Sequence, residues 1–108
     1  MHLSLQQSKG GEYKVALPQL FTAFVSKALK RSGLTQDKFA MELGIQRAAV
    51  NNWLNGRNYP ADEHIRKMAE MTGDDPDEMI AIRESLNIHE RLRRKGYKIN
   101  RIGYYLLN

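Results

Sequence analysis

Cysteine and long apolar runs are both absent from this chain of 108 residues. Without cysteine, disulfide scaffolds, thiol catalysis and cysteine-based zinc sites are all excluded. No apolar run approaches the roughly 18 residues that a membrane span needs, which predicts a soluble chain without membrane contact. Residues 1–7 have neither the basic nor the apolar segment of a signal peptide. These absences predict a small protein of a reducing compartment.

Catalytic and metal-binding motifs are missing as well. The three histidines, His2, His64 and His89, are scattered, and no two have the spacing of a helical metal site. Gly10-Gly11 lacks the Lys-Ser/Thr pair that a phosphate loop needs. No nucleophile-bearing motif accompanies the serines. The sequence therefore predicts no enzyme activity, no metal and no cofactor.

Charge is plentiful but unevenly distributed. The formal net charge is +5, while residues 1–61 carry +5, residues 62–82 carry −5 and residues 83–108 carry +5. Two basic segments around an acidic one predict a molecule with one side toward a polyanion and another toward solvent. The hydrophobic fraction of 42% is sufficient for the core of one domain.

Apolar residues recur at spacings of three and four, which predicts helices and an all-α fold class. We interpret residues 1–18 as a flexible N-terminal arm, residues 19–82 as a five-helix domain and residues 83–108 as a basic and apolar extension. Two points stay open. The fifth helix ends near Leu86 or continues to Lys95, and the tail from Tyr97 fits either a helix or a strand.

The most informative stretch is residues 36–55. Two short helices joined by a short turn with glycine cross at about 90–120°. A small residue fits where the helices touch, and Ala40 is there; Gly44 stands where the turn needs left-handed backbone. A branched apolar residue, Val50, fits where the second helix leans back on the first. The rest of the shared core is predicted to be Phe39, Leu43, Ile45 and Trp53.

This stretch resembles the helix-turn-helix of the Cro/CI-type family (lambda repressor-like, XRE family) of phage repressors and related bacterial regulators. Residues 33–36, 55–57, 59–60 and 69–73 support the resemblance, which covers roughly residues 19–82. It implies a five-helix lambda repressor-like domain that binds double-stranded DNA as a homodimer at a two-fold symmetric operator, usually to repress transcription. It also implies a cytoplasmic, nucleoid-associated protein of a bacterial cell or a phage-infected host, with no cofactor.

Residue roles follow from the matched positions. By the family pattern, Arg47, Ala48 and Asn52 match base-reading places, and Asn51 contacts either bases or backbone. The chemistry agrees, because arginine pairs with guanine, asparagine with adenine, and an alanine methyl meets the thymine methyl. An ordinary exposed helix face would have a similar composition. Phosphate contacts are expected from the helix N-termini and the loop after the recognition helix: Gln36, Lys38, Gln46, Asn55, Arg57, Asn58 and Tyr59.

The dimer contact of this family lies in or just beyond the fifth helix. The predicted dimer residues are Met79, Ile82 and Leu86, with Ile99, Ile102 and Leu106 from the tail. The apolar tail could pack back on the domain, bury against a second subunit or belong to a longer protein, and we favour the second subunit. The basic run at residues 91–95 could follow a phosphate backbone, bind an acidic partner or be solvated.

Two further functions are open besides a phage-type or mobile-element repressor. An antitoxin would repress its own operon and hold a toxin, its protein partner, through the C-terminal extension. A protein-interaction module would retain the fold without needing Arg47 or Asn52, and truncation of its tail would abolish activity. We favour DNA binding because the expected DNA face, from Arg47 to Asn58, is free of acidic residues.

Overall fold

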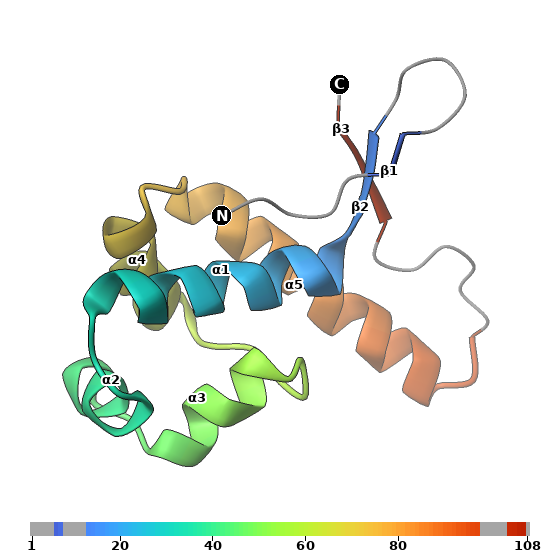
Figure 1. The fold of residues 1–108 in the computed structure, drawn as a ribbon. Helices are drawn as coiled ribbons and strands as arrows, with labels where there is room; N and C mark the ends of the chain where they lie inside the picture. The colour runs from blue at the N-terminus through green and yellow to red at the C-terminus, as the bar shows by residue number, and fades with distance from the viewer. Residues whose placement is uncertain (1–5, 8–12, 98–103, 108) are drawn as a thin grey trace.

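The computed structural model describes residues 6–7, 13–97 and 104–107, which form five helices and three short strands (Figure 1). The predicted five-helix, lambda repressor-like architecture is confirmed. The helices are α1 (Leu17–Ser32), α2 (Gln36–Leu43), α3 (Arg47–Leu54), α4 (Asp62–Thr72) and α5 (Pro76–Arg94). The strands are β1 (Gln6–Gln7), β2 (Tyr13–Ala16) and β3 (Tyr104–Leu107).

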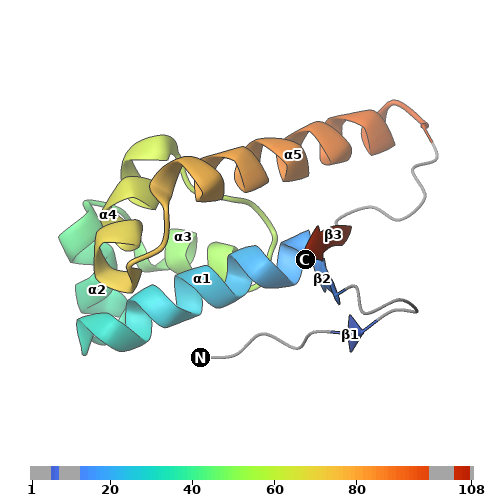
Figure 2. The same ribbon diagram turned by 90° about the horizontal axis from the view of Figure 1, so that it is seen from above.

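A single apolar core joins the five helices. Helix α1 contacts α2, α3, α4 and α5. It crosses the middle of the molecule in Figure 1, and Figure 2 shows it along the side of the helical part opposite α5. Each buried large apolar side chain contributes about 1.5–3 kcal/mol to folding. In the described part of the chain no helix is long and apolar enough to span a bilayer. The largest fully buried apolar side chains are Phe21, Val25, Phe39, Val50, Ile65 and Met68.

Both ends of α2 are set by single residues. The Thr35 hydroxyl accepts a hydrogen bond from the backbone N–H of Lys38 at 3.3 Å and so caps the first turn. At the other end Gly44 has a φ of +72°, which strains any residue with a side chain. Its N–H donates to the Met41 carbonyl at 3.0 Å. Helix α2 therefore stops after eight residues, and the chain turns directly into α3.

The prediction of a flexible arm over residues 1–18 was wrong at its C-terminal end. Helix α1 begins at Leu17, because Pro18 is tolerated in a first helical turn, where its missing N–H has no partner to lose. Strand β2 pairs antiparallel with β3, in a register that sets Tyr13 against Leu107 and Ala16 against Tyr104. Strand β1 pairs with the other edge of β2. Such pairing between the two ends of the chain leaves no local sequence signal.

The predicted domain boundary at residue 82 was also wrong, because it falls inside α5. The helix runs to Arg94, and Lys95 and Gly96 end it, so the longer of the two open alternatives is correct. Residues 83–94 therefore belong to the helical domain. In the tail, residues 104–107 form a strand rather than a helix.

Candidate nucleic-acid interface

Helices α2 and α3 pack together at the surface of the molecule. At their contact Ala40 is buried, and its carbonyl accepts the N–H of Ile45 at 2.9 Å, which closes the turn. Because α3 buries one stripe against α2 and α1, its opposite side faces solvent. Of the predicted motif core, Ile45 is half-buried and Gly44 is exposed in the turn, while the others are buried: Phe39, Ala40, Leu43, Val50 and Trp53.

The outer side of α3 carries the residues expected to read bases. Arg47, Ala48 and Asn51 are exposed, and Asn52 is half-buried one turn further on. Gln46 is the N-cap residue, and its exposed side chain forms no capping hydrogen bond. The fold therefore gathers these five residues on one surface, which we call the α3 face.

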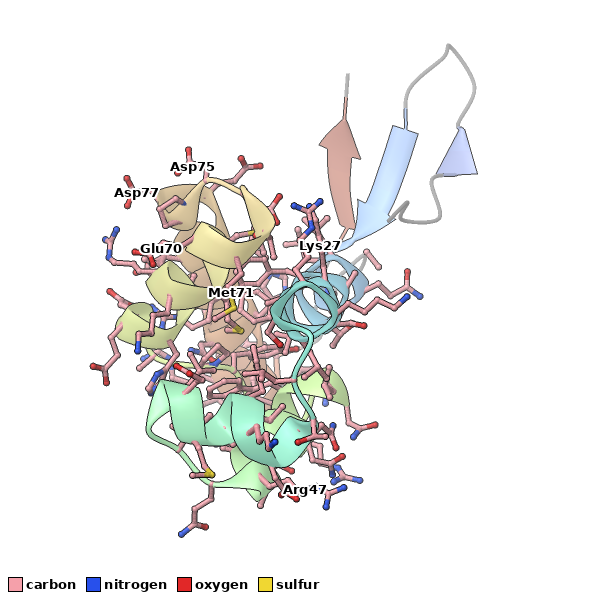
Figure 3. All side chains as sticks on the ribbon, turned by 60° about the vertical axis from the view of Figure 1, so that its left-hand side comes forward. Lys27, Arg47, Glu70, Met71, Asp75 and Asp77 are labelled. Carbon is pink, nitrogen blue, oxygen red and sulfur yellow. The ribbon has the colours of Figure 1, made fainter. Side chains whose placement is uncertain are left out.

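Charge is separated across the molecule. Figure 3 shows Arg47 at the opposite end from Glu70, Asp75 and Asp77, which belong to the acidic segment at α4 and the start of α5. An anion approaching the α3 face therefore avoids this acidic segment. The arrangement agrees with the expectation of one side for a polyanion and one for solvent.

Residues 47–58 contain no acidic residue, but the fold places one acidic side chain of α2 next to them. Asp37, in the first turn of α2, lies with its Oδ1 3.7 Å from Nε of Arg47. Both side chains are about two-thirds exposed, so the pair contributes little to stability. Its effect is geometric, because the carboxylate holds the guanidinium near the N-termini of both α2 and α3. The sequence separation of ten residues hides this contact, which depends on the turn at Gly44.

The loop after α3 is connected to the α3 face by hydrogen bonds. Nη1 of Arg57 donates to Oδ1 of Asn52 at 3.5 Å, a long and therefore weak bond. Nδ2 of Asn55 donates to the Asn51 carbonyl at 2.8 Å and to its Oδ1 at 3.3 Å. An amide oxygen can accept two hydrogen bonds, so Oδ1 of Asn52 can accept from adenine while Arg57 stays beside it.

The loop itself presents Arg57 and Asn58 to solvent, whereas Tyr59 is half-buried. The Tyr59 ring packs edge-on against Phe21, with 5.3 Å between ring centroids. Burial, and then the nearby Glu90 carboxylate, raise the pKa of the Tyr59 hydroxyl, which therefore remains a protonated donor near neutral pH. Tyr59 thus anchors the loop to the core.

The N-terminus of α2 holds the remaining predicted phosphate contacts. Gln36 is the first residue of the helix and is half-buried, and Lys38 is exposed two residues later. The Asp37–Arg47 contact brings this helix end next to the α3 face. The positive end of the α2 dipole therefore lies beside that face.

The predicted dimer residues of α5 are placed differently from the expectation. Met79, Ile82 and Leu86 are only 6% exposed each, because they pack into the core of their own protomer. These three side chains could therefore contact a second subunit only if α5 left the core. Leu106 lies in β3, whereas Ile99 and Ile102 lie outside the described residues. On α5 the exposed large apolar residue is Ile88, at 46%.

The described residues include no group of three or more histidine, aspartate or glutamate side chains that could hold a metal ion. The α3 face and the loop after it carry the amide groups of Gln46, Asn51 and Asn52 and the guanidinium groups of Arg47 and Arg57. Such groups recognise phosphates and base edges through hydrogen bonds.

Comparison with known families identifies this architecture. A family model described as helix-turn-helix matches residues 25–79, a span that runs from within α1 to the start of α5. No curated protein and no solved structure gives a significant match. The match covers half of the chain and contains all of α2, α3 and α4, so the chain belongs to the XRE/lambda repressor-like helix-turn-helix family of DNA-binding transcriptional regulators.

Proposed function

We propose that this regulator is a sequence-specific repressor of phage or mobile-element type that binds a two-fold symmetric operator as a homodimer. The observation that supports this most is the α3 face, which carries both Arg47 and Asn52, with Arg57 of the following loop beside Asn52 and the acidic segment on the far side. Such a protein would act in the cytoplasm of a bacterial cell or an infected host, on the nucleoid.

In this proposal the α3 face enters the major groove. Arg47 reads guanine through O6 and N7, Asn52 reads adenine through N6 and N7, and the Ala48 methyl meets a thymine methyl. Each good bidentate pair discriminates against the wrong base by about 1–3 kcal/mol. Asn51, whose Oδ1 and carbonyl already bind Asn55, contacts the groove edge or the sugar-phosphate backbone.

Phosphate contacts on both sides of the groove would fix the register. Gln36, Lys38 and Gln46 lie at the helix N-termini, where free N–H groups and the dipole favour an anion. Arg57 and Asn58 hold the phosphates on the other side, with Asn55 and the Tyr59 hydroxyl as further donors. These contacts carry affinity, and the α3 face carries sequence preference.

Selection of bound duplexes from a random pool tests this function. The enriched sequences should contain two inverted half-sites about 34 Å apart, and their binding should weaken steeply with salt. Failure to enrich any sequence, together with a shallow salt dependence, would contradict the proposal. An interaction module would also fail this test and would instead lose its activity on removal of residues 98–108.

For the dimer, we propose contact through the exposed face of α5 around Ile88. When two copies of this helix pack antiparallel about a two-fold axis at Ile88, Glu84 of one copy faces Arg91 of the other, and the reverse. Both residues are exposed, and their charges are complementary. This face replaces the buried residues that the sequence suggested.

The substitution Ile88→Asp should therefore weaken the dimer at least about tenfold, because like charges facing each other across an interface cost several kcal/mol. Sedimentation equilibrium measures this change. Met41→Asp is the matched control, since Met41 is 76% exposed on α2, away from α5. If the two variants had the same dimer dissociation constant, Ile88 would not lie in the dimer interface.

A further inference from the structure

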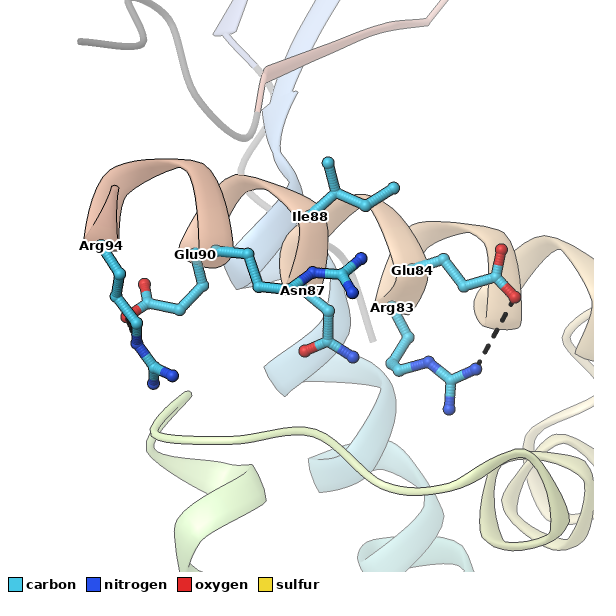
Figure 4. A pocket seen from close by; sticks show the side chains of 7 residues that line it. Arg83, Glu84, Asn87, Ile88, Glu90 and Arg94 are labelled. Atoms are coloured by element: carbon cyan, nitrogen blue, oxygen red, sulfur yellow. Dashed lines mark hydrogen bonds and ion pairs between the residues drawn. The ribbon is translucent and has the colours of Figure 1, made fainter. Parts of the chain in front are cut away.

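The basic C-terminal end of α5 lies beside the loop that follows α3. Figure 4 shows Glu90 and Arg94 extending from α5 toward the segment that links α3 to α4. From the loop side Arg57, Asn58 and Tyr59 line a surface hollow that Glu90, Arg93 and Arg94 line from α5. The two segments are about 35 residues apart in the chain. Only the fold brings them together.

We propose that this hollow, which we call the α5 phosphate site, binds the DNA backbone as a continuation of the contacts made by the loop. The inference rests on the proposed function, since it extends the same phosphate strand from Arg57 and Asn58 to Arg93 and Arg94. Its ligand is a phosphodiester of duplex DNA. For the basic run of residues 91–95 the sequence left three roles open, and this proposal selects contact with a phosphate backbone.

Glu90 organises the two arginines of this site. Its Oε1 lies 3.3 Å from Nε of Arg94, and its Oε2 lies 3.7 Å from Nη2 of Arg93. Each guanidinium has five N–H donors, so these pairings leave most donors free for phosphate oxygens. The side chains of Arg93 and Arg94 are 62% and 76% exposed, and an approaching strand can reach them.

Helix stabilisation and an acidic protein partner are alternative roles for these arginines, and each accounts for less of the arrangement. Basic residues in a last helical turn stabilise the negative end of the dipole by about 0.3–1 kcal/mol each, but this effect requires no neighbouring loop. An acidic protein partner would fit the arginines equally well. Continuity with Arg57 and Asn58, which the proposed function already places on phosphates, favours DNA.

The double substitution Arg93→Gln, Arg94→Gln tests the site on the operator duplex enriched from the random pool. Two lost phosphate contacts per protomer, or four per dimer, should reduce the slope of log affinity against log salt by about 3–4. Random duplex should lose affinity to the same degree, because phosphates carry no sequence. The matched control is Arg66→Gln, Lys67→Gln, which removes the same charge from the exposed face of α4.

The single substitution Glu90→Gln should act in the opposite direction and strengthen binding, because it frees both arginines and removes a negative charge from the phosphate path. Thermal denaturation of each variant checks that the fold is retained.

The salt dependence separates this proposal from the proposed function. If the wild type and both double variants bind the operator with the same steep slope of log affinity against log salt, Arg93 and Arg94 do not contact phosphates, while the proposed function stands. If the wild type itself shows no operator preference, the proposed function fails first. If the Arg93→Gln, Arg94→Gln variant binds DNA like the wild type but no longer binds a poly-glutamate peptide that the wild type binds, the site serves an acidic partner and the proposal is overturned.

Discussion

Replacement of Arg47 by alanine should lower affinity for the selected operator by about 1–3 kcal/mol per half-site, or roughly 5- to 150-fold. The loss arises because a bidentate contact to guanine disappears while the guanine acceptors stay desolvated. Affinity for random duplex should fall only a few-fold, since a phosphate-level contribution of one charge is lost. Titration of labelled operator and random duplexes at one fixed salt concentration measures both effects.

Asp37→Asn provides a control of opposite sign at the same place. Asp37 holds Arg47 at 3.7 Å and also repels phosphates, so its neutral variant should bind random duplex more tightly. Its preference for operator over random duplex should decrease, because the guanidinium is less well positioned. If Arg47→Ala reduced binding to the two duplexes equally, Arg47 would be a phosphate contact rather than a base reader.

Phe39→Ala should lower the free energy of unfolding by about 3–5 kcal/mol, the usual cost of emptying a phenylalanine site in a core. Phe39 is fully buried in the shared core of α2 and α3, where the short helices have few other large anchors. Urea denaturation monitored by the fluorescence of Trp53, which packs in the same core, measures the change. For a domain with a total stability of about 5–15 kcal/mol, such a loss removes between about a fifth and all of the free energy of unfolding.

Met41→Ala is the matched control for this effect. Met41 lies two residues further along α2 and is 76% exposed, so its truncation should change stability by less than about 0.5 kcal/mol. Equal losses for Phe39→Ala and Met41→Ala would mean that α2 does not pack as described. A reduced urea slope for Phe39→Ala alone would indicate that less surface becomes exposed on unfolding, through a less compact native state or a more compact denatured state.

Much of the helical domain could be predicted from local signals. Apolar spacing located all five helices, and Thr35 and Gly44 marked the ends of α2, because caps and left-handed turns involve neighbours within a few residues. The small residue at Ala40 and the branched residue at Val50 identified the helix crossing. The cap at Thr35 is a local hydrogen bond, and the signals at Ala40, Gly44 and Val50 are steric ones within a single motif of twenty residues.

The rest required contacts between distant residues. The pairing of β2 with β3, the burial of Met79, Ile82 and Leu86 within the protomer, and the contact of Asp37 with Arg47 all depend on how helices and strands pack. An apolar stripe on α5 predicts that one side is buried, but the stripe does not say against which partner. For this reason the sequence could not show that Met79, Ile82 and Leu86 are buried within their own protomer.

The amino-acid sequence alone was therefore sufficient to predict the helix-turn-helix and to name the side chains of the α3 face, since both depend on residue types at fixed local spacing. A role for α5 could be proposed only from the packing of the helices. Packing turned its apolar stripe inward, left Ile88 outside and brought Arg93 and Arg94 beside the loop at Arg57. The physical reason is that helix spacing reports which side of a helix is apolar, whereas neighbours along the surface are set by the crossing of elements far apart in the chain.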